Sequence, residues 1–185
     1  MKAHNDFDPE EKVGHALAMA EALSDLHGFR DGVIVHDDLM PSQFLYAADG
    51  SSKLNNFNRG EAMLYNEDSD RYCRYKNGKE GGDFCLPDGF KDGRLNEKID
   101  VFSLGNMMYG LLTGLEVFYD VEEDKEMQQK LVDGELPYID PRWKTNSYGE
   151  GRLVEIIEKC WKYKPNDRAD VFQVTRFLDE TMNKI

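Results

Sequence analysis

The feature that most constrains the fold is a stretch from Val33 to Gly60, in which short apolar runs enclose a loop of polar side chains. The run V-I-V is followed by H-D-D-L-M-P-S-Q and then by F-L-Y. A D-G turn signal and the sequence K-L-N-N-F-N-R-G complete the stretch. Apolar runs of this length between turn residues are typical of short strands. The stretch therefore predicts strands that flank a loop carrying one histidine and two adjacent aspartates.

Composition restricts the chain to a folded domain with few classes of partner. Its 185 residues suit one domain, and 40% hydrophobic residues with 10 Phe, 9 Tyr and 2 Trp favour a packed core. A net charge of -13 excludes nucleic acid and anionic membrane as expected partners, because both need a basic surface. The chain shows no signal-like N-terminus, no membrane-length apolar run and only three scattered cysteines. We therefore expect an intracellular, cytoplasmic protein.

The loop and the strand after it resemble the catalytic and metal-binding loops of eukaryotic protein kinases, whose patterns are H-R-D-L-K-P-x-N and D-F-G. The register is set by four matching positions, namely His36, Asp38, Leu39 and Pro41. Several positions depart from the pattern. The family's Arg, Lys and metal-binding Asn are replaced by Asp37, Met40 and Gln43, and D-F-G is replaced by Asn56-Phe57-Asn58.

Further signatures follow in the order that the family has them. An apolar helix is expected at 95–114, and its D-V-F-S-L-G sequence resembles the central helix of the kinase large lobe. The resemblance implies that Asp100 holds the backbone of the catalytic loop. It also implies an activation-segment equivalent at 60–86 and an ion pair between Asp88 and Arg168, whose rupture would cost about 3–5 kcal/mol if it is buried.

Other helices are expected from capping residues and apolar spacing. The first begins after Asp8, which is followed by proline and two glutamates, and it ends at Gly28. Further helices are expected at 122–132, at 150–163 and from about 169 to 182, with a loop at 137–148. The fold class is therefore mainly α, a kinase-like large-lobe bundle with short β-hairpins carrying the two loops.

The resemblance implies that only the large lobe is represented, as a single domain over residues 1–185. In the family, a small lobe with a Gly-rich loop and a phosphate-pairing lysine precedes the first helix. Residues 1–8 leave no room for it, and G-x-G-x-x-G does not occur in the chain. We therefore expect the small lobe to be absent.

The implied site keeps the general-base position but has weak metal ligands. Asp38 could orient a hydroxyl nucleophile, or it could serve only in hydrogen bonding, and both readings stay open. Magnesium prefers charged oxygens, whereas Asn56 and Gln43 offer neutral amides, so we expect no bound metal. Met40 removes a cation that would neutralise the transferring phosphate.

Structural roles are expected for several of the remaining positions. We interpret His36 as a histidine packed beneath Phe57 rather than a metal ligand, and Phe57 as a core residue. Asn58 replaces a glycine and tolerates a left-handed backbone better than most residues. Leu45 matches the floor under adenine in the family and would be exposed or covered by a partner.

Two functional hypotheses follow, with a third kept for comparison. The first, which we favour, is a pseudokinase-like interaction or scaffold module without a cofactor, binding a protein or a second copy through the face that a small lobe would cover. The second is the large lobe of a divergent protein kinase that uses ATP and magnesium, with its small lobe outside this sequence or on another chain. The third is a metal-dependent hydrolase built on His36, Asp37 and Asp38.

Overall fold

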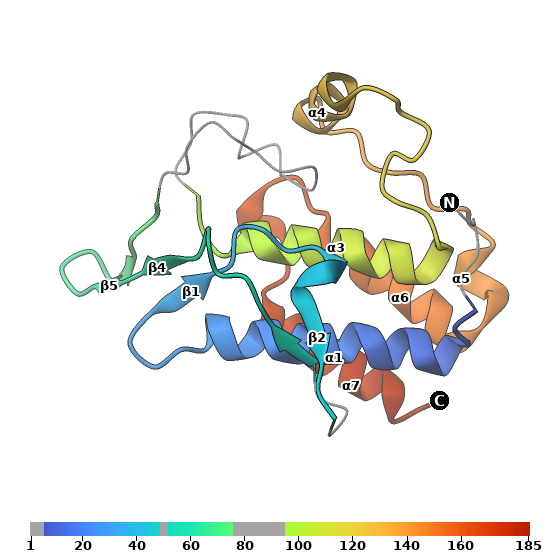
Figure 1. The fold of residues 1–185 in the computed structure, drawn as a ribbon, viewed down its shortest axis with the longest axis horizontal. Helices are drawn as coiled ribbons and strands as arrows, with labels where there is room; N and C mark the ends of the chain where they lie inside the picture. Colours follow the sequence, from blue (N-terminus) through green and yellow to red (C-terminus); the bar gives the residue numbers. More distant parts are fainter. Residues whose placement is uncertain (1–5, 49–51, 76–94) are drawn as a thin grey trace.

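The computed structural model describes residues 6–48, 52–75 and 95–185, and helices dominate the fold in these residues (Figure 1). The helices are α1 (Pro9–His27), α3 (Lys98–Thr113), α4 (Asp124–Val132), α5 (Trp143–Asn146), α6 (Tyr148–Cys160) and α7 (Val171–Met182). Two 3-10 turns, η1 (Pro41–Gln43) and η2 (Pro165–Asp167), accompany them. All strands are only two or three residues long. The prediction of a mainly α fold with short strands is confirmed.

Helix α1 begins and ends where its sequence signals predict. The Asp8 side chain accepts from the Glu11 backbone N–H at 2.8 Å, and the Glu11 side chain accepts from the Asp8 N–H at 2.9 Å. This capping box, with proline at the first helical position, satisfies amides that would otherwise lack partners. Gly28 terminates the helix by donating to the last-turn carbonyls.

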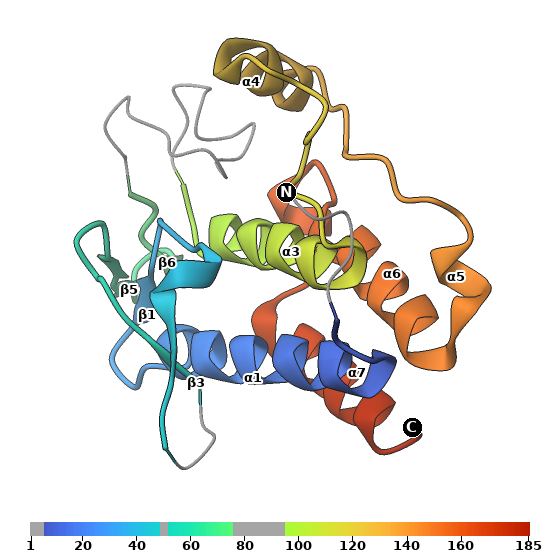
Figure 2. The ribbon, with the colours of Figure 1, turned by 45° about the vertical axis from the view of Figure 1, so that its right-hand side comes forward.

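Helix α3 is the centre of the bundle. It packs against α1 and α6, and 13 of its 16 residues are buried. Figure 2 shows α3 above α1, with α6 behind. A Cβ added at Gly105 would lie 2.9 Å from atoms of Cys160 and Trp161, so only glycine allows this approach of α3 to the end of α6. The Trp161 indole N–H donates to the Asn106 side-chain oxygen at 2.7 Å, which satisfies the polar edge of a buried ring.

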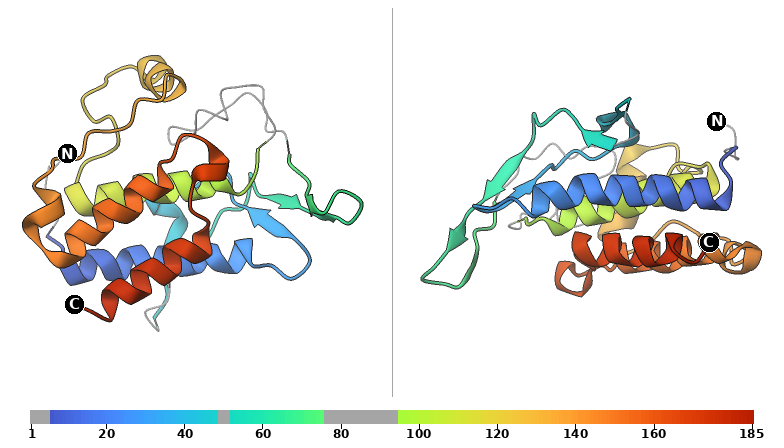
Figure 3. Two further views of the ribbon diagram at one scale, coloured as in Figure 1. Left: turned by 180° about the vertical axis from the view of Figure 1, so that it is seen from behind. Right: turned by 90° about the horizontal axis from the view of Figure 1, so that it is seen from below.

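The C-terminal helices close the other side of the bundle. Figure 3 shows α7 lying along α1, with α6 along α3, and the α1–α7 and α3–α6 pairs are in contact. Helix α4 stands apart from these four helices (Figure 1). The loop predicted at 137–148 is partly wrong, because it contains the one-turn helix α5 and the start of α6. In the part of the chain that the structure describes, no helix combines the length and apolar character needed to cross a membrane.

The strands form three antiparallel pairs rather than one sheet. Strand β1 (Val33–Val35) pairs with β4 (Glu61–Met63), and β2 (Phe44–Tyr46) pairs with β3 (Ser52–Leu54). A third pair joins β5 (Tyr65–Asn66) to β6 (Arg71–Tyr72). The polar loop at residues 36–43 connects β1 to β2, and the polar loop at residues 55–60 connects β3 to β4. Because β1 pairs with β4 and β2 pairs with β3, the two polar loops lie side by side next to the bundle.

A buried ion pair links α1 to the start of α6. Lys12 Nζ lies 2.7 Å from Glu150 Oε1, and both side chains are at most 6% exposed. Asn146 and Ser147 donate to the other carboxylate oxygen at 2.6 and 2.9 Å. Burial raises the pKa of Glu150, but the hydrogen bonds from Lys12 and these two neighbours outweigh it, so the pKa lies below its usual range. The carboxylate is therefore charged and fully coordinated inside the bundle.

We predict that Lys12→Met destabilises the protein by about 3–5 kcal/mol at neutral pH, because it leaves the Glu150 carboxylate buried without its cation. The double variant Lys12→Met/Glu150→Gln should recover most of this loss. Since the folded-state pKa of Glu150 is lowered, its contribution is lost as the pH falls through that pKa. Urea unfolding measures each free energy of unfolding.

The matched control is the exposed pair formed by Lys144 and Glu158, whose charged atoms also lie 2.7 Å apart. Its lysine-to-methionine variant should change the free energy of unfolding by less than about 1 kcal/mol, because water screens exposed pairs. Equal effects at the two sites would contradict the prediction.

Candidate functional site

Asp100 on α3 fixes the backbone of the loop that follows β1. Its carboxylate accepts from the backbone N–H groups of His36 at 2.7 Å and Asp37 at 2.9 Å. His27, the last residue of α1, places its Nε2 3.0 Å from the same carboxylate. Asp100 is 1% exposed, so these contacts replace water entirely. One buried carboxylate thus ties the loop to the ends of two core helices.

Asp37 turns back into the protein instead of facing solvent. Its φ of 61° is left-handed, a conformation that aspartate tolerates better than most residues. The side chain is 3% exposed and lies 3.5 Å from the Arg59 guanidinium. Burial raises the pKa of Asp37 to about 6, with a further rise from the Asp100 charge, while Arg59 and the Tyr75 hydroxyl act in the opposite direction.

His36 is enclosed by the two loops. It is fully buried, its Nε2 lies 2.9 Å from the Asn55 carbonyl oxygen, and its ring centroid lies 5.2 Å from that of Phe57. The geometry is that of a packed histidine that joins the loops. The interpretation of Phe57 as a core residue is wrong, since the side chain is 47% exposed. The ring contacts His36 in a tilted arrangement, and the residue lies on the loop between β3 and β4.

The remaining site residues surround this junction. Asp38 is half-buried, whereas Gln43 is 6% exposed and its backbone carbonyl accepts from the Asn55 N–H at 2.9 Å. Leu45, on β2, is 53% exposed. Among the described residues, the left-handed position of the second loop is Asn56, with a φ of 64°. Asn58, which replaces the family's glycine, is not among the residues with a positive φ.

The side chains at the two implied metal positions are not those that a magnesium-bound nucleotide prefers. Asn56 and Gln43 contribute neutral amides where a hard divalent cation prefers carboxylates. Within residues 6–48, 52–75 and 95–185, no group of three or more His, Cys, Asp or Glu side chains is arranged to hold a metal ion. His36, Asp37 and Asp38 therefore do not form a metal cluster: the first two are directed into contacts with Asn55 and Arg59.

Arg168 is a buried cation near the N-terminal end of α3. Its guanidinium donates to the carbonyl oxygens of Lys98, Lys162 and Tyr163 at 2.8 to 3.1 Å, and the side chain lies over the Phe102 ring. Asp88 lies outside the described residues, so its ion pair with Arg168 stays a prediction. The same holds for the part of the 60–86 segment beyond residue 75.

Sequence reasoning missed three residues that shape the site. His27 contacts Asp100, Arg59 contacts Asp37, and Tyr75 is partly buried beside Asp37. The only local signal was the position of His27 at a helix end next to glycine. Arg59 and Asp37 lie 22 positions apart in the sequence, one on each of the two polar loops. No local sequence pattern indicates that they form a pair.

Comparison with known proteins agrees with this geometry. The pattern of the protein kinase domain family matches residues 1–177, and the chain therefore belongs to the protein kinase family. It is similar to serine/threonine-protein kinase 12 of Arabidopsis thaliana, with 26% identity over 99% of this chain and 38% of the relative. Integrin-linked protein kinase 1 of Arabidopsis thaliana is 24% identical over 94% of this chain and 36% of the relative. Human calcium/calmodulin-dependent protein kinase type IV is 28% identical over 92% and 33%, respectively. The chain thus spans only about a third to two-fifths of the length of these relatives.

We predict that Asp37 makes the protein less stable as the pH rises from about 4 to about 6. The folded-state pKa of about 6 exceeds the ordinary 3.8, so the folded protein binds this proton more tightly than the unfolded chain. The loss amounts to about 3 kcal/mol at most. The measurement is the difference in free energy of unfolding between the wild type and Asp37→Asn across this range.

Histidine titrations are common to both proteins and cancel in that difference. The matched control is Asp25→Asn, which makes the same replacement at an exposed position of α1. The prediction is contradicted if the free energies of unfolding of the wild type and Asp37→Asn change in parallel with pH.

Proposed function

We propose that this chain is the large lobe of a kinase-like domain that binds a protein partner and does not carry out magnesium-dependent phosphoryl transfer. The observation that supports this most is Asn56, a neutral amide where the family pattern has the metal-binding carboxylate. A neutral oxygen leaves the charge of a nucleotide-bound magnesium ion uncompensated. Gln43 does not repair this, since it too is neutral and its side chain is buried.

The rest of the loop favours binding over catalysis. Phosphoryl transfer depends on positive charge around the transferring group, and Met40 stands where the family has lysine. Asp37 adds a second acid beside Asp38, and its partner Arg59 is used within the protein. These substitutions remove charge neutralisation while leaving the hydrogen bonds that shape the loop intact.

The proposed binding face lies over the two polar loops and β2. Phe57 is 47% exposed and Leu45 is 53% exposed, although both are large apolar residues next to a well-packed bundle. We propose that these two side chains belong to one surface, because an exposed apolar patch is typical of a site that another protein covers. We propose that the partner is a protein or a second copy of this chain, in an intracellular and cytoplasmic setting.

A specific observation supports the alternative of an active kinase whose small lobe lies elsewhere. Asp38 keeps the general-base position, and Asp100 holds the loop immediately before it through two backbone hydrogen bonds. Under this alternative, Asp38 accepts the proton of the substrate hydroxyl, and ATP with magnesium is required. The relatives named above carry the word kinase in their names, and this chain matches only part of each of them.

We predict that titration calorimetry with ATP and magnesium chloride shows no saturable binding up to low millimolar concentrations, because the carboxylate needed to hold the metal is absent. The variant Asn56→Asp restores that carboxylate and serves as the gain-of-binding comparison. Micromolar binding by the wild type, or phosphotransfer that Asp38→Ala abolishes, would establish the alternative.

We also predict that the wild type self-associates through the proposed face, because a second copy can cover the exposed apolar side chains. The weight-average mass in sedimentation equilibrium should rise with concentration, and Leu45→Ser/Phe57→Ser should stay monomeric. Tyr138→Ser changes a side chain that is 74% exposed outside this face and is the control. A wild type that remains monomeric at every concentration would rule out the second copy and leave only a different protein as partner.

A further inference from the structure

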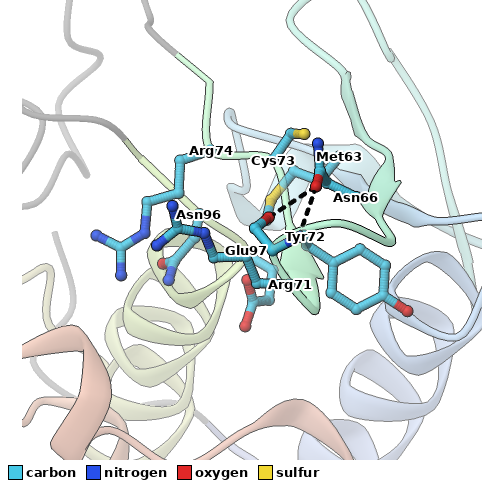
Figure 4. A pocket seen from close by; sticks show the side chains of 9 residues that line it. Met63, Asn66, Arg71, Tyr72, Cys73, Arg74, Asn96 and Glu97 are labelled. Atoms are coloured by element: carbon cyan, nitrogen blue, oxygen red, sulfur yellow. Dashed lines mark hydrogen bonds between the residues drawn. The ribbon is translucent and has the colours of Figure 1, made fainter.

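A pocket lies between the β5–β6 hairpin and the start of α3. It has a volume of about 670 Å³. Figure 4 shows Arg74, Asn96 and Glu97 on one side of it and Asn66 and Tyr72 on the other. Its lining comprises Met63, Asn66, Ser69, Arg71, Tyr72, Cys73, Arg74, Asn96 and Glu97.

The pocket contains two arginines that are not used in ion pairs with the described residues. Arg71 and Arg74 are exposed, and neither guanidinium lies within 4.0 Å of a carboxylate oxygen there. This is notable in a chain with 36 acidic and 23 basic residues, where acids are abundant. Two guanidinium groups at one pocket provide up to ten N–H donors by their chemistry, roughly five each.

The two asparagines add further donors because their oxygens are already engaged. The Asn66 side-chain oxygen accepts from the Ser69 backbone N–H at 2.9 Å and from the Ser69 hydroxyl at 2.8 Å. The Asn96 side-chain oxygen accepts from the Lys98 N–H at 3.2 Å. Each amide therefore has its NH₂ group left to donate, and the pocket is rich in donors and poor in acceptors.

Two features set the kind of anion that fits. The pocket adjoins the N-terminal end of the 16-residue helix α3, where the helix dipole favours negative charge. Among the described residues of the lining, Glu97 is the one carboxylate, and it weakens anion binding by repulsion. An anion with several oxygens that bridges both arginines gains enough charge-assisted hydrogen bonds to offset this repulsion.

We propose that this pocket binds a phosphate monoester, through Arg71 and Arg74 with the amide groups of Asn66 and Asn96. The ester belongs either to a phosphorylated side chain of a peptide or to a small molecule, because both present the same three terminal oxygens. The site is distinct from the Asp37 loop and does not depend on the proposed loss of phosphotransfer.

The test is titration of the full chain at low salt with phenyl phosphate, a phosphoserine peptide and a phosphotyrosine peptide. Binding is measured by calorimetry and by the NMR shifts of the arginine side chains. We expect saturable binding that weakens as salt is added. Arg71→Met and Arg74→Met should each lower the affinity about tenfold, and Glu97→Gln should raise it. Tighter binding of one peptide than of phenyl phosphate identifies a peptide source, and equal affinities identify a small-molecule ester.

The matched control is Arg176→Met, which removes an exposed arginine of α7 outside the pocket. It should leave the affinity unchanged, and circular dichroism checks that every variant is folded. The proposal is overturned if no phosphate ester binds saturably, if Arg176→Met weakens binding as much as the pocket variants do, or if acetate binds as tightly as the esters.

Discussion

The carboxylate of Asp100 is the constraint on which the arrangement of the two polar loops depends. It is buried on the central helix and accepts hydrogen bonds from two successive loop amides, while His27 contacts it from the end of α1. A buried carboxylate with fewer donors would be costly, since its lost hydration would not be replaced. The loop and the helix ends therefore stabilise one another. All three contacts are between protein groups, so none of them involves a nucleotide, a metal or a phosphate.

The same constraint explains the unusual behaviour of Asp37. Its amide must point at Asp100, so its backbone adopts a left-handed conformation and its side chain is carried into the interior. There it lies near a second carboxylate, and burial raises its pKa to about 6. Arg59 from the second loop offsets part of this cost. The family pattern has an arginine at the position of Asp37. Here the first polar loop carries the acid and the second polar loop carries the cation, so the sign of the charge at this position is reversed.

The sequence was informative where structure is local and silent where it depends on packing between distant residues. The ends of α1 followed from Asp8, Pro9 and Gly28, and the family pattern placed Asp100 on the central helix. By contrast, the pairs Lys12–Glu150 and Arg59–Asp37 join residues from separate elements, and no periodicity indicates them. Exposure of Phe57 was missed because a phenylalanine between two strands has the same local pattern whether or not another element covers it. The left-handed conformation at Asn56 could not be predicted, because both Asn56 and Asn58 tolerate it and only the loop geometry distinguishes them.

Retention of a loop's shape and retention of its chemistry are separate questions in this protein. Asp100, His36 and the Gln43–Asn55 backbone contact fix the path of the two loops, and any function that uses this surface needs them. Their presence therefore does not distinguish an enzyme from a binding module. An enzyme and a binding module are distinguished by the side chains that would hold a metal or neutralise a phosphate, because these side chains do not fix the path of the loop. At those positions the chain has Asn56 and Met40, and this difference is the basis of our proposal that the surface serves binding rather than phosphoryl transfer.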